Sequence, residues 1–177
     1  MNEAFCIYVN HSCSMHVYAK PANGWGCQDV QSLAKATAVF NDAITKIMPE
    51  DRKRNNWARS NFHAITDHTG KYNAKSLSGV EAALVDDYNR VFKDMWKPLF
   101  DCFDSKLGKP EDILDVFGTD RHVSMNFIPI NNRICRTVEF RCPPAVSTAS
   151  DAQKWTAFTL AFVSRSLSFK SWTPNTA

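Results

Sequence analysis

The chain has 177 residues, 44% of them hydrophobic, which is enough for one domain with a substantial core. Its formal net charge of +3 is small, and the basic residues are dispersed apart from DRKR at residues 51–54, so composition does not favour a nucleic-acid-binding protein. No apolar run is long enough to span a membrane, and the first residues lack the pattern of a secretion signal. We therefore expect a cytoplasmic protein with no membrane partner.

The first half of the chain predicts two short strands, a helix and a loop. FCIYV at residues 5–9 and SMHVYA at residues 14–19 are β-like runs separated by turn-prone residues. From Gln28 to Met48 the apolar residues recur at helical spacing, and Pro49 follows the expected end of this helix. The polar stretch at residues 50–76 has no sustained period and predicts a long loop.

The second half predicts a long helix and then a β-hairpin. Helical spacing returns from Val80 to about Phe103, where Pro98 is expected to kink or end the helix. Two β-like runs at residues 120–130 and 133–143 follow, joined at INNR. The two asparagines of INNR suit the positive φ angles of a tight hairpin turn.

A last helix completes the predicted fold. Ser147, Thr148 or Ser150 can cap its beginning, and its apolar side continues at helical spacing. There is no internal repeat, so we expect a single α+β domain over residues 1–170 and a flexible tail at residues 171–177. The six cysteines show no C-x-x-C spacing, which predicts reduced, mostly buried thiols.

The stretch TVEFRCPP at residues 137–144 contains the most informative pattern. Alternate side chains of a strand share a face, so Glu139 and Arg141 are expected on one face and Val138 and Phe140 on the other. The apolar face would pack on the core. The charged face would be available for a ligand.

Several motifs occur in the order found in one superfamily. SCSMHVYAK at residues 12–20 is similar to the strand that carries a G-x-H-x-H motif in the glutamine-synthetase-like carboxylate–amine ligases, and RTVEFRCPP is similar to their later E-F-R strand. The closer resemblance is to the amidoligase family, common in fungi and bacteria. It includes PEDRKRNNWARSN at residues 49–61 and DRHVSMNF at residues 120–127, and it extends from about Val9 to Leu167.

This resemblance implies a curved antiparallel sheet with helices packed on one face and a charged face that holds ATP and Mg²⁺. Members are thought to transfer the γ-phosphate of ATP to a small carboxylate, which a small amine then displaces to form an amide. Glu139 and His16 would bind the metal, and Arg141 would hold the phosphoryl group with its forked guanidinium. By the same resemblance, the catalytic residues would be Glu139, Arg141 and Arg121, and the ligand-binding residues His16, Tyr18, Asn126, Arg59 and Asn56.

The chain departs from the family pattern at two places. Tyr18 stands at the second histidine position of the H-x-H motif, where it can bind a phosphate but is a poor metal ligand. The family also begins with strands that carry an E-x-E pair, whereas Glu3 is the only acid before His16. We therefore expect a glutamine-synthetase-like domain that is incomplete at its N-terminal strands, with an open sheet edge suited to self-association.

Structural roles for the same residues stay open. Glu139 and Arg141 also suit cross-strand ion pairs on a solvated face, and a lone strand histidine such as His16 is commonly structural. Arg121 and Asn126 suit positioning of the hairpin, and Arg59, with its neighbouring asparagines, suits binding of loop carbonyls. Three functions remain: an ATP- and Mg²⁺-dependent amide ligase, a shortened relative that binds or converts a small molecule without ATP, and a self-associating interaction module.

Overall fold

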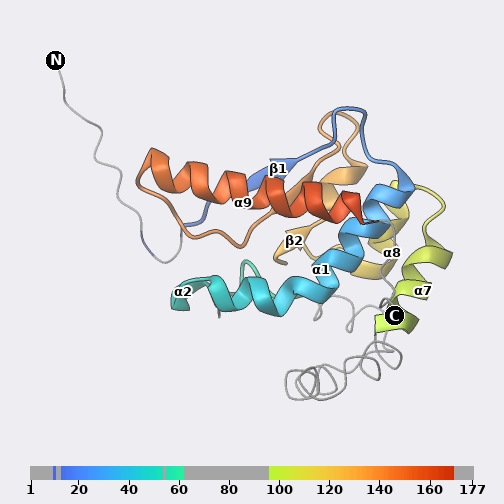
Figure 1. Ribbon diagram of the computed structural model, residues 1–177, viewed down its shortest axis with the longest axis horizontal. Coiled ribbons are helices and arrows are strands. Elements are labelled where there is room, and N and C mark those ends of the chain that lie inside the picture. The colour runs from blue at the N-terminus through green and yellow to red at the C-terminus, as the bar shows by residue number, and fades with distance from the viewer. Residues whose placement is uncertain (1–9, 11–12, 54, 62–95, 170–177) are drawn as a thin grey trace.

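The computed structural model describes residues 10, 13–53, 55–61 and 96–169 (Figure 1). Helices and strands are mixed in it, as the α+β prediction requires. The elements, in chain order, are β1 (Val17–Ala19), α1 (Cys27–Ile47), α2 (Glu50–Lys53), α7 (Lys97–Lys106), η2 (Pro110–Ile113), α8 (Leu114–Phe117), β2 (Met125–Asn126), η3 (Ile128–Asn131), β3 (Val138–Phe140) and α9 (Ala149–Ser168).

The three described strands form a small, open antiparallel sheet in which β3 lies between β1 and β2. Glu139 on β3 is directly opposite Tyr18 on β1 and Asn126 on β2. Because strand side chains alternate between faces, these three polar residues form one row across one face of the sheet. The curvature of the sheet and its likeness to glutamine synthetase stay predictions.

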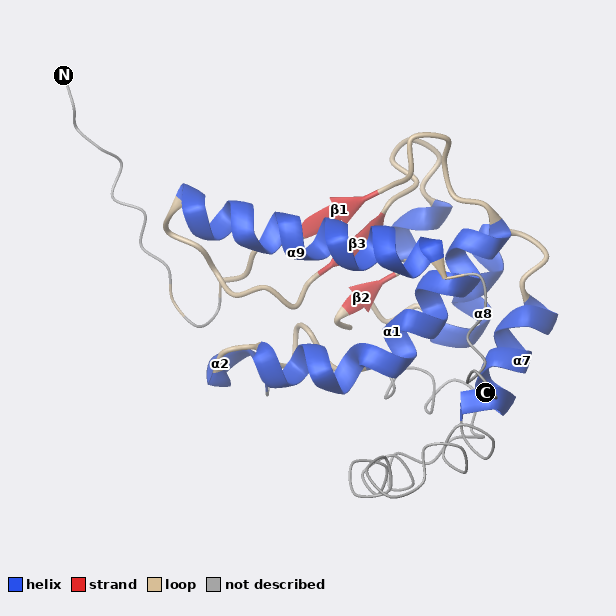
Figure 2. Ribbon diagram, in the orientation of Figure 1, coloured by secondary structure: helices blue, strands red, loops and turns tan. Residues whose placement is uncertain are grey.

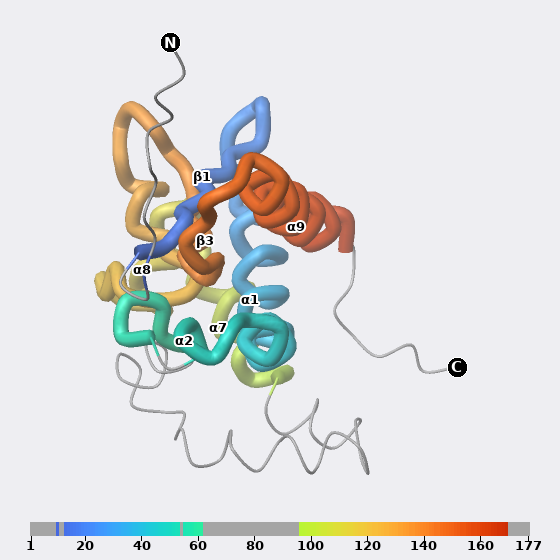
Figure 3. The backbone as a smooth tube through the Cα atoms, turned by 90° about the vertical axis from the view of Figure 1, so that its left-hand side faces the viewer, coloured from blue at the N-terminus to red at the C-terminus, as the bar shows by residue number. Residues whose placement is uncertain are grey.

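Helices α1 and α9 cover the apolar face of the sheet, as Figures 1, 2 and 3 show from two directions. Phe140 of β3 points into this layer, with ring centroids 6.0 Å from Phe158 and 6.4 Å from Phe162 of α9. The helix predicted from Gln28 is confirmed. Apart from Ala36, the residues it buries recur at helical spacing: Val30, Leu33, Ala34, Thr37, Ala38, Asn41 and Ile44.

The start of the last helix is also confirmed. Thr148 is the N-cap of α9, and its side-chain oxygen accepts a hydrogen bond from the backbone N–H of Asp151 at 3.1 Å. This bond satisfies one of the backbone donors that every helix leaves unpaired at its first turn. Thr148 is therefore the residue, among the three candidates, that positions α9 over the sheet.

The tight turn predicted at INNR is wrong, although the two flanking strands do pair. The chain between β2 and β3 first forms η3, whose Ile130 is buried in the core. Asn132 then accepts hydrogen bonds with its side chain from the N–H groups of Ile134 and Cys135. Its φ is −72°, and within the described residues Arg136 is the non-glycine residue with positive φ. Burial of Ile130 therefore outweighed the turn preference of asparagine.

Pro98 stands in the first turn of α7, a position that proline tolerates. The predicted kink depends on the chain before Trp96, which lies outside the described residues. The predicted strand at residues 5–9, the helical stretch at residues 80–95 and the tail at residues 171–177 lie outside the described residues.

The five described cysteines are free thiols, in agreement with the predicted reduced state. Cys142 is buried, but Cys135 is exposed and the other three are half-buried, so the expectation of mostly buried thiols is wrong for this part of the chain. Among the described helices, none combines the length and apolar character needed to cross a bilayer.

Candidate functional site

Four side chains converge on the carboxylate of Glu139 at the centre of the polar face. Its Oε1 accepts hydrogen bonds from Tyr18 Oη at 2.7 Å and Arg141 Nη1 at 3.0 Å, and it lies 2.8 Å from Nδ1 of His16. Its Oε2 accepts a hydrogen bond from Asn126 Nδ2 at 2.7 Å. The structure therefore brings together five of the predicted site residues. Glu139 itself is only 3% exposed.

The surroundings of Glu139 keep it ionised. Burial would raise the pKa of this carboxyl, but the hydrogen bonds from Asn126 and Tyr18 and the positive charge of Arg141 outweigh burial and hold the pKa below its usual range. The same contact acts on its partner, since the hydrogen bond to Glu139 raises the pKa of Tyr18. At neutral pH, Glu139 is thus a carboxylate and Tyr18 a neutral hydroxyl donor.

The contact with Glu139 also fixes the tautomer of His16. An ionised carboxylate can only accept hydrogen bonds, so Nδ1 of His16 carries the proton. Burial, assisted by the nearby Arg141 cation, lowers the pKa of His16 despite the opposing effect of Glu139, so the ring is neutral at pH 7. Its Nε2 is then unprotonated and accepts a hydrogen bond from the Ser14 hydroxyl at 2.9 Å. His16 is therefore arranged as a proton acceptor.

Main-chain contacts hold the polar row in place. The side-chain amide of Asn61, which is fully buried, donates to the carbonyl oxygen of Met125 at 2.7 Å and accepts from its N–H at 2.8 Å, as a neighbouring strand would. These bonds fix β2 and so direct Asn126 toward Glu139. Asn61 thereby fulfils the structural role that the sequence left open for the asparagines of this segment.

Arg141 links the polar face to the segment after α2. Its Nε donates to the carbonyl oxygen of Trp57 at 3.2 Å while its Nη1 binds Glu139. No acceptor among the described residues contacts its Nη2, and that atom is not fully buried. One edge of the guanidinium is therefore free to bind an anion.

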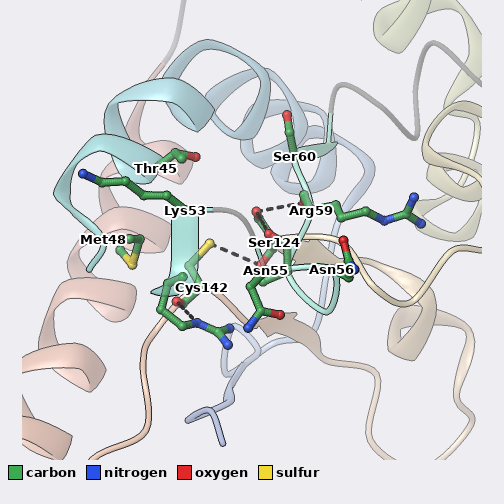
Figure 4. Close-up of a pocket in the computed structure, with 11 residues that line it drawn as sticks. Thr45, Met48, Lys53, Asn55, Asn56, Arg59, Ser60, Ser124 and Cys142 are labelled. Atoms are coloured by element: carbon green, nitrogen blue, oxygen red, sulfur yellow. Dashed lines mark hydrogen bonds between the residues drawn. The ribbon is translucent and has the colours of Figure 1, made fainter. Parts of the chain in front are cut away.

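A cavity of about 270 Å³ lies beside the ends of β2 and β3 (Figure 4). It is bounded by the last turn of α1, by α2 and by the segment that follows α2, and its lining includes Arg52, Asn55, Asn56, Arg59, Ser124 and Cys142. Arg52 is buried, and it donates from Nε to the carbonyl oxygen of Cys142 at 3.2 Å and from Nη2 to that of Arg141 at 2.7 Å. Arg52 of the cavity lining thus contacts the main chain of Arg141, whose side chain belongs to the Glu139 cluster.

The three other predicted site residues lie away from Glu139. Arg59 and Asn56 line the cavity, and the guanidinium of Arg59 forms an ion pair with Asp120. Arg121 is exposed, and its described contact is with the ring of His122 at 3.3 Å. Arg121 is therefore not brought to the charged face on which the resemblance placed it.

Sequence reasoning missed two residues, Ser14 and Arg52. Ser14 lies two positions before His16, so the alternation of a strand places both on one face, and this spacing was an available signal. Arg52 belongs to the run DRKR, in which several cations are adjacent. No local pattern marks which member of such a run is buried.

The described residues alone do not fit a resident Mg²⁺ ion. Mg²⁺ requires an almost octahedral set of oxygen ligands. Within the described ranges, no three His, Cys, Asp or Glu side chains are grouped to hold a metal ion. Glu139 already accepts several hydrogen bonds and contacts His16 directly. Metal binding by Glu139 and His16 would require this contact to open.

Comparison with protein families finds a match that spans most of the chain. A family model described as "Putative amidoligase enzyme" matches residues 1–163. The chain belongs to the amidoligase family. The match includes the strands, the cavity and every residue of the Glu139 cluster of this amidoligase-family protein. No curated protein and no solved structure matches it.

Proposed function

We propose that this amidoligase-family protein joins a small carboxylic acid to a small amine at the polar face of its sheet, using MgATP as a substrate. The observation that supports this most is the group formed by Glu139 and four other predicted residues, which combines an anion-binding cation with a neutral histidine. Family membership supports the ligase class.

In the proposed reaction, the acid's carboxylate attacks the γ-phosphorus of ATP, ADP leaves, and an acyl phosphate forms. The amine nitrogen then attacks the acyl carbon, the bond from this carbon to the phosphate oxygen breaks, and inorganic phosphate leaves with the electron pair. The attacking nitrogen must lose a proton in this second step. Such a sequence requires charge neutralisation at phosphate and a base for the amine.

The residues of the cluster match these two requirements. The free edge of Arg141 can bind a phosphoryl oxygen, and the hydroxyl of Tyr18 shares Glu139 Oε1 with Arg141. The unprotonated Nε2 of His16 can accept the proton of the amine once Ser14 releases it. Glu139 would orient His16, Tyr18 and Arg141 and would not itself transfer protons, because its lowered pKa makes it a weak base.

The test is a measurement of ADP release from MgATP with panels of amino acids and amines, together with mass spectrometry of amide products. We expect ADP release to need both an acid and an amine. Arg141→Lys keeps the charge but loses the fork, and it should lower turnover about a hundredfold. Arg136→Lys is the matched control, because Arg136 also pairs with a glutamate, Glu111, but away from the cluster. Amide formation that is equally fast in both variants would contradict the assigned role of Arg141.

A second candidate is a relative that binds or converts a small molecule without ATP. It is favoured by the saturated hydrogen bonding of Glu139 Oε1 and by the lack of a three-residue metal group in the described ranges. Saturable binding of an amino acid without any ADP release in its presence would support this candidate over the ligase.

A further inference from the structure

Arg52 is a second buried charge, and it contacts the main chain of Arg141, the residue whose side chain binds Glu139. The residue is only 4% exposed, and within the described part of the chain its hydrogen-bond partners are two neutral carbonyl oxygens. The carboxylate whose charge most affects it belongs to its neighbour Asp51, which makes no described ion pair with it. Burial lowers the pKa of the Arg52 guanidinium, yet an arginine stays charged at neutral pH.

An isolated buried cation is unfavourable unless hydrogen bonds or an opposite charge compensate for lost hydration. The carbonyl oxygens of Arg141 and Cys142 use Nη2 and Nε of Arg52. No described residue accepts a hydrogen bond from Nη1, and this atom is not among the fully buried polar atoms that lack a partner. Nη1 thus has unused donor capacity, and Arg52 belongs to the lining of the cavity.

The rest of the lining increases the positive charge of the cavity. Lys53 and Arg59 belong to it, whereas none of its described lining residues is acidic. Their carboxylate partners, Glu50 and Asp120, are not part of the lining. Figure 4 shows the side chains of Lys53 and Arg59 extending outward in opposite directions. Arg52 is thus the cation at the cavity wall, and the other two contribute from the rim.

Neutral hydrogen-bonding groups complete the lining. Asn55, Asn56 and Ser124 contribute amide and hydroxyl groups. Burial raises the pKa of Cys142 to about 11, so its thiol stays neutral and adds no negative charge. The volume of about 270 Å³ is at the low end for sites that bind organic ligands, which favours a small occupant.

We propose that this cavity is an oxyanion subsite in which Arg52 binds a carboxylate or a phosphoryl group of a small molecule. Both groups present acceptor oxygens that suit a guanidinium donor. In the ligase described above, the subsite would hold the acid substrate or the phosphate released from it, and that assignment rests on the proposed function. Binding of the oxyanion by Arg52 does not depend on the proposed function.

The experiment measures melting temperature against increasing concentrations of inorganic phosphate or acetate, with chloride at equal ionic strength as the reference. We expect a saturable stabilisation by at least one of the two anions in the wild type. Arg52→Met should weaken the apparent affinity at least about tenfold, because a charge-assisted hydrogen bond is lost. A response to phosphate alone would assign the subsite to phosphoryl groups, and a response to acetate alone to carboxylates.

A second variant keeps the test decisive if Arg52→Met does not fold. Lys53→Glu places a carboxylate at the rim without removing the hydrogen bonds of Arg52 to the carbonyls of Arg141 and Cys142, and it should weaken anion affinity several-fold. Lys97→Glu is the matched control. Lys97 pairs with Asp101 on α7, much as Lys53 pairs with Glu50, and α7 packs on the N-terminal half of α1. The anion affinity of Lys97→Glu should equal that of the wild type.

The proposal is overturned if neither anion stabilises the wild type more than chloride does, or if Lys53→Glu and Lys97→Glu respond identically to the wild type. The two proposals fail separately. Saturable anion binding that depends on Lys53, with no release of ADP under any condition, would leave the subsite in place and contradict the ligase. Acid- and amine-dependent ADP release without any effect of Lys53→Glu on anion binding would support the ligase and contradict the subsite.

Discussion

Glu139 and Arg52 are both buried and charged, and both contact Arg141, but they are compensated in different ways. The carboxylate of Glu139 has a cation, two other donors and a histidine around it. The guanidinium of Arg52 has two carbonyl oxygens and an unused Nη1 at a cavity. A fully satisfied buried charge organises its neighbours. A partly satisfied one beside a cavity is able to bind a ligand.

The largest expected effect comes from removing the satisfied charge. Glu139→Gln leaves the half-buried Arg141 without its carboxylate and should lower the free energy of unfolding by about 3–5 kcal/mol in urea denaturation. The control is Glu111→Gln, whose partner Arg136 is mostly exposed, and it should cost no more than about 1 kcal/mol. Equal losses in the two variants would show that the Glu139 cluster is no more stabilising than a surface ion pair.

Removing the partly satisfied charge should cost less. Arg52→Met takes a charge-assisted donor from the carbonyls of Arg141 and Cys142, but it also relieves the burial of a cation that has no carboxylate partner. In a buffer without phosphate or carboxylates we expect a loss of about 1–2 kcal/mol by the same denaturation measurement. A loss as large as that of Glu139→Gln would mean that the two charges are equally compensated within the protein.

The polar face was accessible to sequence reasoning because strand periodicity determines it. In TVEFRCPP, alternation placed Glu139 and Arg141 apart from Val138 and Phe140, and the structure buries Phe140 against α9 as that pattern requires. Helical spacing likewise predicted α1 and α9. These features depend on positions close together in the chain.

What sequence reasoning could not supply depends on contacts between distant segments. Arg52 is buried because carbonyl oxygens at the end of β3, about 90 positions away in the chain, accept its hydrogen bonds. The side chain of Asn61 likewise pairs with the main chain of Met125 on β2, which is distant in the chain. Arg121 shares a motif with Asn126, but it stands before β2, outside the paired part of the sheet, and faces solvent. Motif membership does not determine side-chain direction.

The smallest expected effect concerns His16, whose pKa is affected by both Glu139 and Arg52. Burial and the cations Arg141 and Arg52 lower its pKa, and Glu139 opposes them. Below about pH 6.5 an unfolded histidine binds a proton that the folded His16 still rejects. The unfolded state therefore binds more protons in this range, so stability falls as the pH falls from 7 to 5.

Replacement of His16 tests this sign directly. In His16→Gln this part of the pH dependence should disappear, so that the free energy of unfolding declines less between pH 7 and pH 5 than it does in the wild type. Other histidines are common to both proteins and cancel in the difference, and the ordinary carboxyl pKa of about 4.3 places the titration of Glu139 below this range. Urea denaturation at several pH values measures the difference. A steeper decline in His16→Gln would mean that Glu139 holds the proton on His16 more strongly than burial and Arg141 remove it, which would contradict the lowered pKa on which the proton-acceptor role of His16 rests.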